Sequence, residues 1–128
     1  MFEPKFLNFD DIVFIHNQEI NMSGGSTGIR DQNGIKSAIG ATQASFEGKY
    51  LNNIFEMSAT YLNSIVKNHP FIDGNKRTGL ASALTFLFIN GIELEEKYEE
   101  ELADMVLKLT ENEISKEDIV DFFKERII

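Results

Sequence analysis

Residues 69–91 read HPFIDGNKRTGLASALTFLFING, a short polar loop that leads directly into the most apolar helix of the chain. Apolar side chains fall on every side of the helix predicted for residues 75–90, among them Leu80, Ala81, Ala83, Leu84, Phe86, Leu87, Phe88 and Ile89. A helix that is apolar all round is normally covered by other elements. The stretch therefore predicts a helix buried at the centre of a bundle, with Asn90-Gly91 as its end signal.

Apolar residues at helical spacing predict further helices on both sides of this one. The expected ranges are residues 9–20 with Asp10 as N-cap, residues 34–46, residues 51–68, residues 98–109, and residues 116–127 with a capping box of Ser115 and Asp118. Residues 92–94 give the only suggestion of a strand. We expect an all-α fold: a compact single-domain bundle of about six helices that covers residues 1–128.

Composition limits the possible partners. The chain has 12 basic and 21 acidic side chains and a formal charge of −9, which repels a nucleic-acid backbone. No apolar run reaches the ~18 residues of a membrane span, and residues 1–6 lack the pattern of a signal peptide. We therefore expect no nucleic-acid partner, no membrane association and a cytoplasmic location; the absence of cysteine fits any compartment.

The loop before the buried helix has the composition of an anion site. If the helix begins at Asn75, the backbone N–H groups of Lys76, Arg77 and Thr78 lack intrahelical acceptors and point outward with the positive end of the helix dipole. Gly74 has no Cβ to block the approach of an anion to the backbone. The side chains of Lys76 and Arg77 add positive charge. This combination suits a polyphosphate.

Two side chains of the loop suit catalysis. Asp73 stands beside the expected phosphates, where a carboxylate can hold Mg²⁺. The imidazole of His69 can take a proton from an attacking hydroxyl. Taken singly, Asn75 as an N-cap, Gly74 as a turn and His69 as a polar helix end have ordinary structural explanations. Only their combination favours a catalytic loop.

The loop fits the motif His-x-Phe-x-Asp/Glu-Gly-Asn-x-Arg, and at these residues the chain resembles the Fic/Doc family, within it the death-on-curing (Doc) toxins. Residues 28–31, 55–62, 75–78 and 86–91 also look like Doc. The resemblance implies an all-α fold and an enzyme that uses ATP and Mg²⁺. It implies His69 as general base, Asp73 as Mg²⁺ ligand, and a phosphate cradle made of Gly74, Asn75, Lys76 and Arg77.

Two departures from the wider Fic motif bear on the group that is transferred. Most adenylyltransferases of the family have glycine at the position of Lys76 and a second arginine at the position of Leu80. Leucine cannot grip outer phosphates. In Doc toxins the same Asn-Lys-Arg-Thr pattern accompanies γ-phosphoryl transfer. The resemblance thus favours a protein Ser/Thr kinase; an adenylyltransferase and a catalytically silent nucleotide- or peptide-binding module are the alternatives.

The resemblance also implies partners. The target would be a threonine of elongation factor Tu, with arrest of translation as the result. Many Fic proteins carry an inhibitory Ser/Thr-x-x-x-Glu motif, and no Ser or Thr of this chain has Glu four residues later. Inhibition would then come from a separate antitoxin of the Phd type, whose segment folds into a groove on the toxin.

Several other residues have two interpretations. The glycine-rich loop within residues 22–33 is either a flap that pairs with target peptide, with Arg30 as a substrate or nucleotide contact, or a flexible connector. We expect His16 to be packed on its helix rather than to bind a ligand, and Lys67 to favour the end of its helix. The aromatic side chains predicted to be core are Phe55, Phe86, Phe88, Phe122 and Phe123.

Overall fold

The computed structural model describes residues 3–128, and within this range the chain forms six α-helices, a short 3-10 helix and one β-hairpin. The helices are α1 (Phe9–Ser23), α2 (Gln32–Thr42), α3 (Ile54–Asn68), α4 (Asn75–Ile89), α5 (Glu99–Thr110) and α6 (Lys116–Lys124). The 3-10 helix η1 (Glu96–Tyr98) precedes α5, and the strands β1 (Ser45–Phe46) and β2 (Lys49–Tyr50) form the hairpin. The predicted all-α bundle is confirmed.

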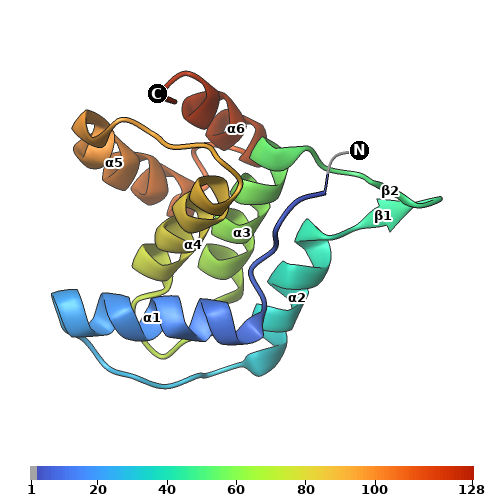
Figure 1. Cartoon of the computed structure of the whole chain (residues 1–128). Helices are drawn as coiled ribbons and strands as arrows, with labels where there is room; N and C mark the ends of the chain where they lie inside the picture. Colours follow the sequence, from blue (N-terminus) through green and yellow to red (C-terminus); the bar gives the residue numbers. More distant parts are fainter. Residues whose placement is uncertain (1–2) are drawn as a thin grey trace.

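The centre of the bundle is α3 rather than α4. In Figure 1, α3 runs through the middle of the molecule and packs against α2, α4, α5 and α6. All residues from 57 to 62 of α3 are buried. Helix α4 lies close along α3 because Gly79 stands at the contact: a Cβ there would come within 3.2 Å of the Leu62 side chain.

The prediction that Phe88 belongs to the core is wrong. Its side chain is 63% exposed, whereas Phe86 and Phe123 are fully buried, and Phe55 and Phe122 are partly buried. Helix α4 packs mainly against α3 and α1, and its Leu80 and Leu84 pack on the apolar cluster to which α5 and α6 contribute. The face of α4 that carries Phe88 stays open.

Several helix ends and the strands differ from the sequence-based expectations; α1 extends to Ser23 and α3 begins at Ile54. The N-cap of α1 is Asn8, which forms a capping box with Asp11, and Asp10 lies inside the helix. Helix α2 ends at Thr42, and the residues expected to extend it form the hairpin, whose turn places Glu47 and Gly48 at positive φ (51° and 79°). Helix α6 ends at Lys124. Strands of two exposed residues leave no periodic pattern to detect.

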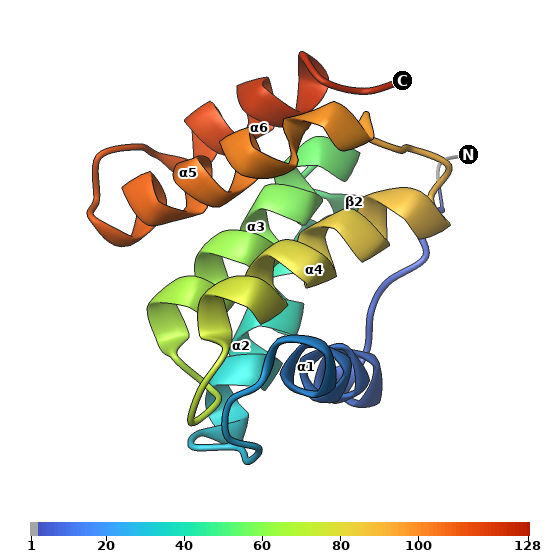
Figure 2. The same cartoon turned by 90° about the vertical axis from the view of Figure 1, so that its left-hand side faces the viewer.

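Two connections meet at one end of the bundle. The segment between α1 and α2 and the loop between α3 and α4 lie side by side at the bottom of Figures 1 and 2. An antiparallel bridge joins Ile29 of the first to Phe71 of the second. Among residues 3–128, no helix is long and apolar enough to cross a bilayer.

Candidate active site

The loop opens with a strained residue. α3 ends at His69, which adopts the left-handed conformation (φ 48°, ψ 55°), an uncommon state for a residue with a Cβ. Arg30 stabilises this end: its Nε donates to the His69 carbonyl at 2.8 Å and its Nη2 to the Asn68 carbonyl at 3.0 Å. The structure therefore gives Arg30 a role in holding the loop. A contact between Arg30 and the substrate remains a prediction.

The side chain of Asn75 clamps the loop from the other end. Its Oδ1 accepts from the Phe71 N–H at 2.9 Å, and its Nδ2 donates to the Phe71 carbonyl at 2.9 Å. Both residues are buried, with Phe71 only 1% exposed. The N-cap of α4 is Gly74 (φ 76°), so the side chain of Asn75 is not the cap, and its part in binding phosphate remains a prediction. It fixes the backbone path between His69 and the helix.

The start of α4 provides an anion site. Gly74 makes no side-chain capping bond, and no acidic residue lies in the first turn. Within the described range, the backbone N–H groups of Asn75, Lys76 and Arg77 have no hydrogen-bond acceptor. Thr78, which the sequence placed in this set, is not free because its N–H donates to the Gly74 carbonyl at 2.9 Å. Three free donors at the positive end of a helix favour a bound anion.

A pocket of about 360 Å³ opens over these donors. It is lined by His69, Ile72, Asp73, Gly74, Asn75, Lys76 and Arg77. Every residue predicted from the motif lies in this set, and Arg30 does not. The pocket thus brings together the candidate base, the carboxylate and the start of the helix.

Of the two basic side chains that line the pocket, one is exposed to solvent and the other is held by hydrogen bonds to the protein. Lys76 is exposed. Arg77 is half-buried, and its Nη1 donates to the Gly24 carbonyl at 3.0 Å, with the Glu19 carbonyl at 3.5 Å. Arg77 therefore holds the end of α1 as well as lining the pocket.

Asp73 is suited to a magnesium ion. Its carboxylate accepts from the Ser26 N–H at 3.1 Å and from the Gly74 N–H at 2.8 Å. These two bonds, and more weakly the nearby Arg77, hold the pKa of the carboxyl below its usual value, so the group is ionised at neutral pH. Residues 3–128 contain no cluster of three or more metal-ligating side chains. One exposed carboxylate fits Mg²⁺, which takes few protein ligands and fills its shell with water and phosphate oxygens.

The imidazole of His69 is exposed, and its Nδ1 lies 3.3 Å from Nδ2 of Asn75. This amide nitrogen only donates, so a neutral ring that accepts from it carries its proton on Nε2. For Nε2 to take a proton from a hydroxyl, the ring must adopt the other tautomer and give up this long contact.

The segment from Gly24 to Asp31 is anchored to the loop by its backbone. The N–H groups of Arg30 and Asp31 donate to the Pro70 carbonyl at 2.7 and 3.0 Å, and the Ile72 N–H donates to the Gly28 carbonyl at 3.1 Å. A freely flexible connector does not fit these bonds. Pairing between the segment and a target peptide remains a prediction.

Two residues with open interpretations lie in different places. His16 is buried on α1, as expected, but it also touches the loop: its Nε2 lies 2.7 Å from the Asp73 carbonyl. Lys67 points away from the pocket, where its Nζ donates to the Leu109 carbonyl at 2.9 Å and to Asn112. Its charge therefore stabilises the end of α5 rather than that of its own helix.

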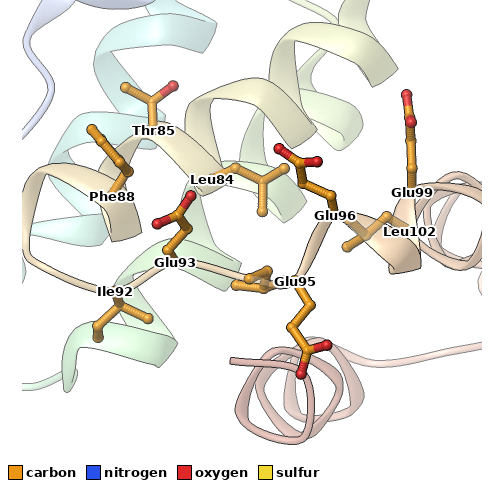
Figure 3. Close-up of a pocket in the computed structure, with 10 residues that line it drawn as sticks. Leu84, Thr85, Phe88, Ile92, Glu93, Glu95, Glu96, Glu99 and Leu102 are labelled. Atoms are coloured by element: carbon orange, nitrogen blue, oxygen red, sulfur yellow. The ribbon is translucent and has the colours of Figure 1, made fainter. Parts of the chain in front are cut away.

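A second concave surface lies on the open face of α4. This apolar groove of about 560 Å³ is lined by Leu84, Thr85, Phe88, Ile92, Glu93, Leu94, Glu95, Glu96, Glu99 and Leu102. In Figure 3 the Glu95 carboxylate points away from those of Glu93, Glu96 and Glu99, and it is paired with Lys97 at 3.2 Å. The groove is thus apolar inside and acidic at its rim.

The fold and the loop define a class of protein: a helical bundle whose anion-binding loop opens a helix that packs along the central one. Residues 6–87 match the sequence profile of the Fic/DOC family. "Protein kinase doc" of Escherichia phage P1 is 36% identical over 117 residues, which cover 91% of each chain. "Toxin Doc" of Mycolicibacterium smegmatis is 33% identical over 96 residues, 74% of this chain and 71% of that protein. The chain belongs to the Fic/Doc family.

Proposed function

We propose that this protein is a toxin of a toxin–antitoxin pair that uses ATP and Mg²⁺ to phosphorylate a serine or threonine hydroxyl of another protein. The observation that carries the proposal is the uncapped start of α4, with three free backbone N–H groups in one pocket with His69 and Asp73. The names of the two relatives, a protein kinase and a toxin, support it.

In the proposed reaction, the residues that line the pocket assist transfer of the γ-phosphoryl group of ATP. The hydroxyl oxygen attacks the γ-phosphorus, a new O–P bond forms, the bond from this phosphorus to the bridging oxygen breaks, and ADP leaves. His69, in the tautomer with Nε2 unprotonated, takes the hydroxyl proton. The N–H groups at the start of α4 and Lys76 hold the phosphates. Mg²⁺ at Asp73 would neutralise phosphate charge.

Phosphoryl transfer is preferred to transfer of AMP because of the second turn of α4. Leu80 is partly buried and packs on the apolar cluster formed with α5 and α6. Leucine has no positive charge, so this position cannot bind the outer phosphates as the second arginine of the Fic motif would. An adenylyltransferase is the alternative, and a silent binding module is less consistent with the presence of both His69 and Asp73.

The nucleotide test uses ATP labelled separately at the α and γ positions, with elongation factor Tu as the first candidate target. We expect label from the γ position only; label from the α position alone would overturn the kinase proposal. His69→Asn is the sharpest variant, since asparagine tolerates the left-handed backbone and removes the base. It should fold like the wild type and lose transfer at least 100-fold. Transfer at the full rate would remove His69 as general base.

The groove on α4 is the proposed docking surface for the antitoxin. Its apolar floor and acidic rim, on a chain of net charge −9, fit a segment with apolar side chains on one face and basic residues beside them. Toxin and antitoxin would meet in the cytoplasm, where the translation machinery is.

A pair of matched variants tests this surface. Phe88 in the groove and Phe46 on the hairpin are similarly exposed, at 63% and 67%. Phe88→Asp should weaken binding of a Phd-type antitoxin at least tenfold, and Phe46→Asp should not. Equal effects of the two substitutions would contradict the assignment of the groove.

A further inference from the structure

The ring of His16, on α1, contacts the catalytic loop. It is 1% exposed, and its ring stacks on Phe71 with centroids 3.9 Å apart and planes 4° apart. Its Nε2 lies 2.7 Å from the carbonyl oxygen of Asp73. A carbonyl only accepts, so Nε2 is the donor.

The loop is therefore held from two sides. Asn75, on α4, binds both backbone groups of Phe71. His16, on α1, packs on the ring of the same residue and binds the backbone two residues later. Between these two fixed points the chain has little freedom, and the Asp73 carboxylate projects from the fixed segment.

The bond to His16 also affects the anion site. The Asp73 carbonyl is four residues before Arg77, so it is the group that would accept the Arg77 N–H if α4 began one residue earlier. In the structure this carbonyl is bound by His16 and the Arg77 N–H has no acceptor in the described range. An apolar residue of similar size would fill the space but leave the carbonyl unbound.

We propose that His16 is a positioning residue for phosphoryl transfer: its hydrogen bond to the Asp73 carbonyl sets the direction of the Asp73 carboxylate and keeps the Arg77 N–H available to a phosphate. The inference rests on the proposed function of the pocket. It assigns to His16 a donor role beyond its packing.

Two substitutions separate the donor from the packing. His16→Phe keeps a ring that can stack on Phe71 and removes the donor, whereas His16→Gln keeps a donor of similar reach and removes the ring. We expect His16→Phe to raise the KM for Mg-ATP about tenfold with little change in kcat, as for the loss of one buried hydrogen bond. His16→Gln should restore most of the affinity. Ile15→Ala, a core truncation on the same helix, should lower the melting temperature and leave the KM unchanged.

A second measurement does not depend on activity. In His16→Phe, amide hydrogen exchange at Ile72 and Gly74 should become at least tenfold faster than in the wild type, whereas exchange in the middle of α3 should change little. The inference is overturned if His16→Phe keeps both the KM and the exchange rates within twofold of the wild type, or if His16→Gln fails to rescue. A wild type that neither binds nor transfers from ATP overturns the proposed function instead, and the exchange rates then decide the role of His16.

Discussion

Asn75→Asp is the most informative substitution in the loop because it changes one nitrogen to oxygen without changing shape. The new side chain can still accept from the Phe71 N–H, as Oδ1 of Asn75 does at 2.9 Å. Its second oxygen, however, replaces the nitrogen that donates to the Phe71 carbonyl at 2.9 Å. Two acceptors then face each other in a buried site.

The cost can be estimated from these contacts. Loss of the donor removes a hydrogen bond with a net value of about 1 kcal/mol and leaves the Phe71 carbonyl unsatisfied, at about 1–3 kcal/mol. Phe71 is only 1% exposed, so water cannot replace the lost partner. We expect a loss of about 2–4 kcal/mol in the free energy of unfolding at pH 7, and a loss of nucleotide affinity because the loop no longer holds its shape.

The sign of the pH dependence follows from the protonated form. A neutral carboxyl can donate to the Phe71 carbonyl, so the folded state raises the pKa of the new group above the ~3.9 of a free aspartate. The variant should therefore lose little free energy of unfolding relative to the wild type below pH ~3.9. The loss should grow as the pH rises through the pKa of the new carboxyl in the folded state. Urea unfolding of the variant and the wild type at pH 4 and pH 7 measures this difference.

The chain supplies a matched control at the other end of α4. Asn90 binds Lys5 in the same way, accepting from its N–H at 2.8 Å and donating to its carbonyl at 2.9 Å. This site is less buried, so Asn90→Asp should cost less stability and leave nucleotide binding unchanged. The reasoning is refuted if Asn75→Asp binds Mg-ATP like the wild type, or if its stability deficit is the same at both pH values.

Three further predictions concern other parts of the molecule. Burial raises the pKa of Tyr61 to about 12, so stability should fall by about 1.4 kcal/mol per pH unit between pH 10 and 12, and Tyr61→Phe should remove this dependence in urea titrations. Gly25→Ala would place a Cβ 2.6 Å from the Asp73 carboxylate and should raise the Mg²⁺ requirement of transfer, whereas Gly24→Ala, also at positive φ but with open space around it, should not. Lys67→Met should lower the free energy of unfolding by about 1–2 kcal/mol through loss of the bonds at the end of α5, with the transfer rate unchanged.

The sequence was sufficient for the helices and for the members of the pocket because both depend on local patterns. α4 begins at Asn75, and the capping box of Ser115 and Asp118 is present, as predicted. The sequence could not show that the Asn75 side chain turns back onto Phe71, since an N-cap was the simpler interpretation of an asparagine at a helix start. The contact of His16 with Asp73 spans 57 residues and depends on how α1 crosses the bundle. No local signal reports such a contact.

The distribution of charge explains why the site depends on backbone groups. The whole chain has a formal charge of −9, which opposes the approach of a polyphosphate. Of the two basic side chains in the pocket, Arg77 already binds the end of α1, and Lys76 is free at the surface. The fixed donors at the start of α4 must therefore supply much of the attraction, and they do so only while the loop keeps them unpaired. On this argument, substitutions that loosen the loop should weaken nucleotide binding as much as loss of the Lys76 charge does.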